Sequence, residues 1–125
     1  MSDTLVTVVE HPNYLKRAAK LLTVAQMDEI ADIVAANPKI GDVMQGTRGF
    51  RKFRYASVQG KGKSSGVRII HMYVTEDQEV HLIDIYGKGE KDNLSKEERN
   101  ELAKLAAILK QEATKKKKKK KGDKK

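Results

Sequence analysis

The sequence contains no cysteine and no tryptophan among its 125 residues. Without cysteine, the chain can form no disulfide scaffold, no thiolate metal site and no cysteine nucleophile. The three histidines, His11, His71 and His81, are spread over distant parts of the sequence and lack the spacing of metal ligands. We therefore expect no bound metal and no other cofactor, and satisfied sheet histidines are the default interpretation, although His71 and His81 could be neighbours on facing strands.

Long apolar runs are also missing. Residues 1–10 include Asp3 and Glu10, have no basic segment, and carry an apolar run too short for a signal peptide or a membrane span. We expect a soluble, cytoplasmic protein that does not act at a membrane. Its length fits a single domain, because one hydrophobic core usually forms in chains of roughly 100 to 150 residues.

Acidic residues are almost absent from the end of the chain, where residues 115–125 hold nine lysines and one aspartate. This segment supplies +8 of the net charge of +9, so residues 1–114 are nearly neutral. Because like charges repel, we predict a folded domain over 1–114 and a disordered poly-lysine tail over 115–125. The tail could add nonspecific affinity for RNA, or it could serve only solubility.

Within the predicted domain, the basic residues are unevenly placed. Seven of them lie between positions 48 and 68, a stretch without any aspartate or glutamate. They are Arg48, Arg51, Lys52, Arg54, Lys61, Lys63 and Arg68. A basic patch on an otherwise acidic domain favours a polyanionic ligand such as nucleic acid. The alternative is a solvated strand face whose charges discourage edge pairing.

Two helices are predicted to follow a short first strand. The β-branched run at residues 5–9 is typical of a strand, and Pro12 can open a helix after it. Thr23 and Gln26 form a capping box for a second helix, which Pro38 ends. The inner faces of these helices are expected to hold Leu15, Ala18, Leu22, Met27, Ile30, Ala31 and Val34.

Three strands and a closing helix are predicted next. The pattern alternates over residues 50–55, 67–75 and 79–86, with a loop at 59–66 and another at 87–93. Ser95 and Glu98 form a second capping box, and the closing helix has an inner face of Leu102, Leu105, Ala106 and Leu109. The order β-α-α-β-β-β-α predicts an α+β fold, with helices packed on a twisted, mainly antiparallel sheet.

Several blocks of the sequence resemble the HigB branch of the RelE-type toxins of bacterial toxin–antitoxin pairs. Their order and spacing match along most of the domain. The blocks are Ala18-Ala19-Lys20-Leu21-Leu22, Ala35-Ala36-Asn37-Pro38 with Gly41-Asp42-Val43, the segments 46–54 and 60–68, and the segment 86–95. The resemblance implies a RelE-like fold and an endoribonuclease that enters the ribosomal A site and cuts the bound codon. It also implies a partner antitoxin with a helix-turn-helix domain, whose acidic or disordered segment we expect to cover the basic face.

Cleavage of RNA without metal uses the neighbouring ribose 2′-hydroxyl as the nucleophile. The protein must accept its proton, neutralise charge on the phosphate and protonate the departing 5′ oxygen. Lys52 and Arg54 share one strand face and can lie beside Arg68 of the next strand. Crowding of like charge makes an ammonium group give up its proton more readily, which favours Lys52 as the base or proton relay. Arg54 and Arg68 suit the phosphate, because a guanidinium can hold two oxygens at once.

Further residues are assigned with less support from the pattern. The resemblance puts Lys88 and Lys91 near the leaving group. Tyr86 could stack on a base or donate a proton, or it could be a packing residue at the edge of the core. Lys61 and Lys63, with Arg48 and Arg51, are expected to bind RNA around the cut site rather than to take part in the cleavage. One stacked base orients a nucleotide but does not read a long sequence, so we expect weak codon preference.

Two other functions stay open. A non-catalytic toxin of the same fold could inhibit DNA gyrase, since fold alone does not fix activity. A detoxified RNA-binding regulator is the other possibility. Asp84 raises it, because by strand parity this carboxylate shares a face with Tyr86 and departs from the apolar residues expected there. It could pair with the basic site or weaken RNA binding.

Overall fold

The computed structural model describes residues 6–56, 66–87 and 94–122, with side chains up to Lys116 in the last range. The elements run in the order β-α-α-β-β-β-β-α. Their bounds are β1 Thr7–Glu10, α1 Pro12–Leu21, α2 Val24–Ala36, β2 Asp42–Val43, β3 Arg51–Tyr55, β4 Val67–Val74, β5 Glu79–Gly87 and α3 Lys96–Gly122. The α+β prediction is confirmed, with β2 as an additional two-residue strand. No helix in the described ranges has both the length and the hydropathy to cross a membrane.

The five strands form one sheet in the order β1-β5-β4-β3-β2. Strands β2 to β5 pair antiparallel, and β1 joins the sheet parallel to β5. A β-bulge interrupts the β4–β5 pairing, because Ile70 pairs with Asp84 whereas the next residue, His71, pairs with Leu82. The extra residue, Ile83, lies in the core beneath α3. The side chains of Ile83 and Asp84 are therefore both on the α3 side of the sheet.

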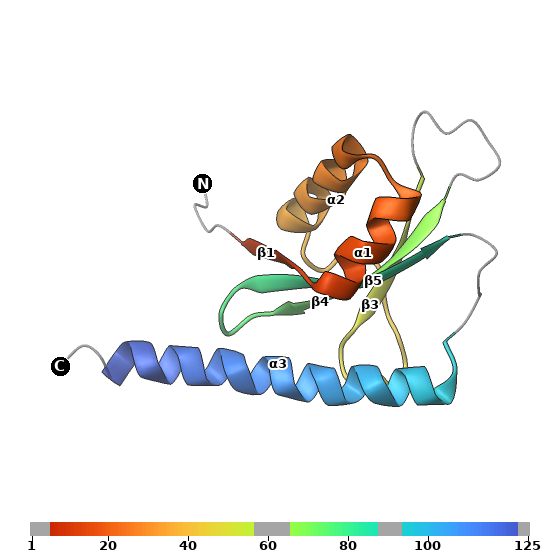
Figure 1. Ribbon diagram of the computed structural model, residues 1–125. Helices are drawn as coiled ribbons and strands as arrows, with labels where there is room; N and C mark the ends of the chain where they lie inside the picture. The colour runs from red at the N-terminus through yellow and green to blue at the C-terminus, as the bar shows by residue number, and fades with distance from the viewer. Residues whose placement is uncertain (1–5, 57–65, 88–93, 123–125) are drawn as a thin grey trace.

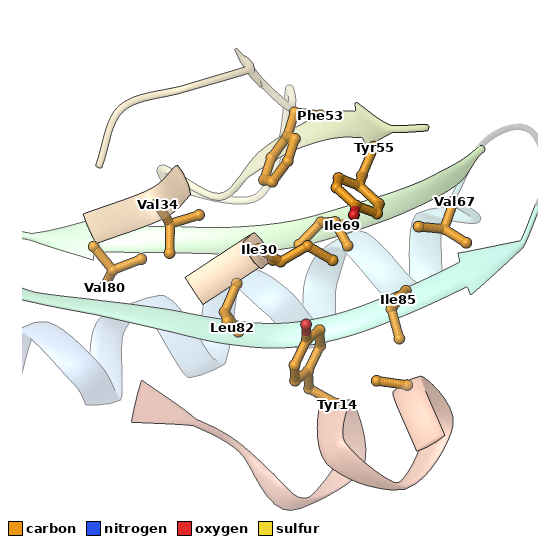
Figure 2. Packing of buried hydrophobic residues seen from close by; sticks show 11 residues of the cluster. Tyr14, Ile30, Val34, Phe53, Tyr55, Val67, Ile69, Val80, Leu82 and Ile85 are labelled. Atoms are coloured by element: carbon orange, nitrogen blue, oxygen red, sulfur yellow. The ribbon is translucent and has the colours of Figure 1, made fainter. Parts of the chain in front are cut away.

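Helices cover both faces of the sheet (Figure 1). One core lies between the sheet and the α1–α2 pair, where Tyr14, Ile30 and Val34 meet the inward residues of the strands (Figure 2). The other core lies between the opposite face and α3, and it contains Phe50, Ile70, Met72, Val74, Ile83, Tyr86, Ala106 and Ala113. The two-residue period of each strand therefore divides its side chains between two separate cores.

The predicted helix starts are confirmed in detail. The Thr23 hydroxyl accepts from the Gln26 amide at 3.1 Å, and the Gln26 side chain accepts from the Thr23 amide at 2.9 Å. Ser95 and Glu98 make the same reciprocal pair at 3.1 and 2.8 Å. The inner face of α1 was predicted only in part, because Leu15 is 38% exposed and Tyr14 packs in its place, four residues before Ala18.

The poly-lysine segment differs from the prediction. Helix α3 continues across residue 114 to Gly122, so the described part of the expected disordered tail is helical. Lysine is a good helix former, and cations near a helix C-terminus interact favourably with the helix dipole. Lys116 also pairs with Asp77 at 3.4 Å and Glu79 at 3.2 Å. These two carboxylates offset the repulsion between Lys116 and the lysines beside it.

Candidate functional site: a cationic face on the sheet

Three basic side chains lie together on the α3 side of the sheet. Arg54 of β3 pairs directly with Arg68 of β4, and Lys52 is two residues before Arg54 on the same strand face. The alternate residues of β3, Phe53 and Tyr55, point into the core beneath α1 and α2 (Figure 2). That burial fixes the strand's orientation, so the predicted convergence of Lys52, Arg54 and Arg68, here called the cationic trio, is present.

The trio borders one cavity of about 380 Å³. The remaining lining comes from Ile40, Gly41, Asp42 and Phe53. Arg54 is exposed, whereas Lys52 and Arg68 are half-buried. Within the described ranges, no carboxylate forms an ion pair with any member of the trio. Among the described residues, three cations and one acidic side chain, Asp42, border this hollow, so its lining keeps an excess of positive charge that can hold a phosphate group.

Backbone geometry at two glycines shapes this cavity. Gly41 has a φ of +94°, and a Cβ there would lie 2.6 Å from the carbonyl oxygen of Lys52. Gly66 has a φ of +107°, and a Cβ there would lie 3.4 Å from Nε of Arg54. Glycine lets the chain approach β3 closely at both points, because it adopts positive φ without steric cost.

Arg51 and Arg48 are placed apart from the trio. Arg51 belongs to the opposite parity of β3, and its guanidinium donates to the carbonyl of Gly41 at 2.9 Å. This contact links the start of β3 to the residue that precedes β2. Arg48 is exposed in the loop before β3, with a φ of +62°, and its carbonyl accepts from Lys110 of α3 at 3.2 Å. The structure therefore does not bring these two predicted RNA-binding residues into the trio's cavity.

Tyr86 is a packing residue, which is one of the alternatives that the sequence left open. It pairs with Arg68 across β4 and β5, but its side chain is only 1% exposed and lies in the core beneath α3. A ring in that position cannot stack on a base while α3 is in place. The other predicted site residues, Lys61, Lys63, Lys88 and Lys91, lie outside the described residues.

Asp84 does not pair with the trio. Its Oδ1 lies 3.0 Å from Nε of Arg17 in α1 and accepts from the amide of Ile85 at 2.8 Å. Arg17 also donates to the carbonyl of Ile85 at 2.8 Å. Sequence reasoning missed Arg17, because nothing in the local pattern of α1 connects it to a strand far along the chain.

The histidines are divided between the two faces of the sheet. His71 is fully buried on the α1–α2 side and its Nε2 donates to the carbonyl of Ile40 at 2.8 Å. His81 instead meets His11, with 2.8 Å between Nδ1 of His81 and Nε2 of His11. His71 and His81, which could have been neighbours on facing strands, therefore have different partners. Among the described residues, no three His, Asp or Glu side chains gather as a metal site.

Comparisons with known proteins bear on the fold. No family model matches the chain. Among solved structures, the chain is similar to an arginine-to-alanine double mutant of the E. coli toxin RelE in the free state, with a TM-score of 0.52 and 22% sequence identity. The match covers 70% of this chain and 86% of the other. The chain has the RelE fold.

Proposed function

We propose that this protein is the toxin of a toxin–antitoxin pair and that it cuts messenger RNA on the ribosome. The observation that carries the proposal is the cationic trio, whose three members border one cavity on a single sheet face. The RelE fold and the sequence blocks that resemble the HigB branch give independent support. The protein would act in the cytoplasm, where translating ribosomes are found.

The reaction follows from the chemistry of the trio. Arg54 and Arg68 bind the non-bridging oxygens of one phosphodiester and stabilise the charge that builds there. The ribose 2′-oxygen attacks phosphorus and gives its proton to Lys52, acting as an amine base or as a relay. The bond from phosphorus to the 5′ oxygen breaks, and that oxygen takes up a proton, for which Lys88 and Lys91 are the proposed donors. The products are a 2′,3′-cyclic phosphate and a free 5′-hydroxyl.

The ribosome would supply the substrate geometry. Tyr86 is buried and cannot stack on a base, so at the trio itself the protein holds RNA through its phosphate. A codon held in the A site would be positioned for in-line attack, and such positioning lowers the entropic cost of the reaction. A partner antitoxin with a helix-turn-helix domain would then act by covering the trio.

Primer extension on ribosome-bound messenger after brief induction tests this function. The proposal predicts cuts at fixed positions within codons and arrest of translation. Lys52→Ala combined with Arg54→Ala should abolish both, whereas Lys16→Ala combined with Lys20→Ala, two exposed lysines of α1, should abolish neither. DNA damage signalling without RNA cuts would indicate a gyrase inhibitor instead, and RNA binding without toxicity would indicate a regulator.

A further inference from the structure

A second hollow lies on the α3 side of the sheet, where the trio also lies, and forms a groove of about 510 Å³ between α3 and the sheet. Its apolar lining comes from Ile70 of β4 and from Leu94, Leu102, Leu105 and Ile108 at α3. Glu98, Glu101 and Lys104 also line it. Glu98 accepts from the Ser95 amide at 2.8 Å, and Glu101 and Lys104, both 74% exposed, lie 4.0 Å apart. Asp84 contributes a carboxylate from β5 to the same groove. A largely apolar slot with a few placed polar groups has the composition of a site for a flat heteroaromatic ring.

The strand register connects this groove to the trio. Ile70 pairs with Lys52 on one side and with Asp84 on the other, and Arg68 is two residues before Ile70. Neighbouring strands are about 4.8 Å apart, so Lys52 and Asp84 are about 10 Å apart across the sheet. A nucleotide whose phosphate lies on the trio can reach this groove with its base.

Asp84 is held in one orientation. The contacts from Arg17 and from the Ile85 amide both engage Oδ1, and within the described ranges no residue engages Oδ2. The Asp84 side chain is 30% exposed. Arg17 also neutralises the carboxylate, which reduces its repulsion of a nearby phosphate. Asp84 therefore offers a fixed hydrogen-bond acceptor in the groove.

We propose that the groove binds the base next to the cut phosphodiester and that Asp84 accepts a hydrogen bond from an amino group of that base. The inference rests on the proposed ribonuclease function. Adenine, cytosine and guanine carry an exocyclic amino group, whereas uracil has none, and its single ring donor, N3–H, lies between two carbonyl oxygens that repel a carboxylate. Asp84 is thus a specificity residue that disfavours uracil, and Arg17 is the residue that positions it.

The test uses purified ribosomes loaded with messengers in which each nucleotide flanking the cut is in turn A, C, G or U. All messengers are cut in one mixture, so the ratio between bases does not depend on how much protein is folded. The wild type should cut about fivefold to tenfold less at uracil in one flanking position, the loss expected from one unmade hydrogen bond. Asp84→Asn, which can donate as well as accept, should reduce this ratio to within about twofold.

Two further variants complete the experiment. Asp84→Glu keeps a carboxylate and should retain the discrimination against uracil. Asp28→Asn removes an exposed acid from α2, on the other side of the sheet, and should cut with the wild-type ratio. Equal cutting of all four bases by the wild type, or an unchanged ratio in Asp84→Asn, overturns the role of Asp84. A wild type that cuts no messenger overturns the ribonuclease function itself.

Discussion

Arg54 of β3 and Arg68 of β4 are direct cross-strand partners on the α3 side of the sheet. Like charges in directly opposite positions destabilise a sheet, by roughly 0.2 to 1 kcal/mol for a pair. The fold therefore keeps an arrangement that opposes its own stability. A site for a polyanion gives a physical reason for it, because a bound phosphate removes the repulsion.

Neutralising one of these arginines should stabilise the free protein while it removes function. Arg54→Gln is expected to raise the free energy of unfolding by roughly 0.2 to 1 kcal/mol in low salt. Urea unfolding at two salt concentrations measures the effect, which should shrink in high salt because the repulsion is screened. A loss of stability in low salt would show that Arg54 has a favourable partner.

Two buried tyrosines should respond oppositely to loss of their hydroxyl groups. Tyr14 is fully buried and, among the described residues, its hydroxyl has no hydrogen-bond partner. The hydroxyl of Tyr55 donates to Glu29. Tyr14→Phe should leave the free energy of unfolding unchanged or raise it by about 1 kcal/mol, and Tyr55→Phe should lower it by about 1 to 2 kcal/mol. Denaturant titration of both variants measures these free energies of unfolding. A larger loss of stability in Tyr14→Phe than in Tyr55→Phe would contradict the assigned contacts.

Gly41 should be far less replaceable than Gly46, although both have positive φ. A Cβ at Gly41 would lie 2.6 Å from the backbone oxygen of Lys52, whereas at Gly46 the nearest atom is Cδ of Arg99 at 3.8 Å. Gly46→Ala should cost about 1 kcal/mol of stability, and Gly41→Ala about 2 kcal/mol or more. Thermal unfolding compares the two. Equal losses would mean that Gly41 does not approach β3 so closely.

Stability should fall as the solution becomes mildly acidic. Burial lowers the pKa of His11, His71 and His81 below the ordinary value of 6.5. The unfolded chain then binds more protons than the folded protein below about pH 6.5, so the free energy of unfolding decreases as pH falls through that value. Each histidine contributes at most about 1.4 kcal/mol per pH unit.

His11→Gln isolates one part of this effect. It removes one titrating group and also the coulombic influence of His11 that helps to lower the pKa of His81. Urea unfolding between pH 7.5 and 5.5 should show a shallower decrease for this variant than for the wild type. Parallel curves would mean that His11 titrates alike in the folded and unfolded chains.

The parts of the structure that follow from local pattern were predictable. Alternation in β3 placed Lys52 and Arg54 on one face because side-chain parity is a property of the strand itself. Two contacts join distant segments: the ion pair of Arg17 with Asp84, and the contact of His11 with His81. The contact of His11 with His81 forms because β1 pairs parallel to β5. No periodicity encodes such pairs.

Other differences have equally specific causes. Strand β2 is two residues long and so has no alternation to detect. The side chain of Tyr86 is on the sheet face that strand alternation predicts, but its burial depends on where α3 crosses the sheet. Near the end of α3, Lys116 pairs with Asp77 and Glu79, which it meets only in the folded protein. The trio could be predicted from sequence, whereas its surroundings required the fold.

The rate of messenger cutting on purified ribosomes tests the central proposal most directly. Removing a positioned charge from a phosphate site typically slows catalysis by about 10² to 10³. Arg68→Ala should therefore cut at least about a hundredfold more slowly than the wild type, and Lys16→Ala should cut at the wild-type rate. If Arg68→Ala cuts as fast as the wild type, the cationic trio is not the site of the reaction.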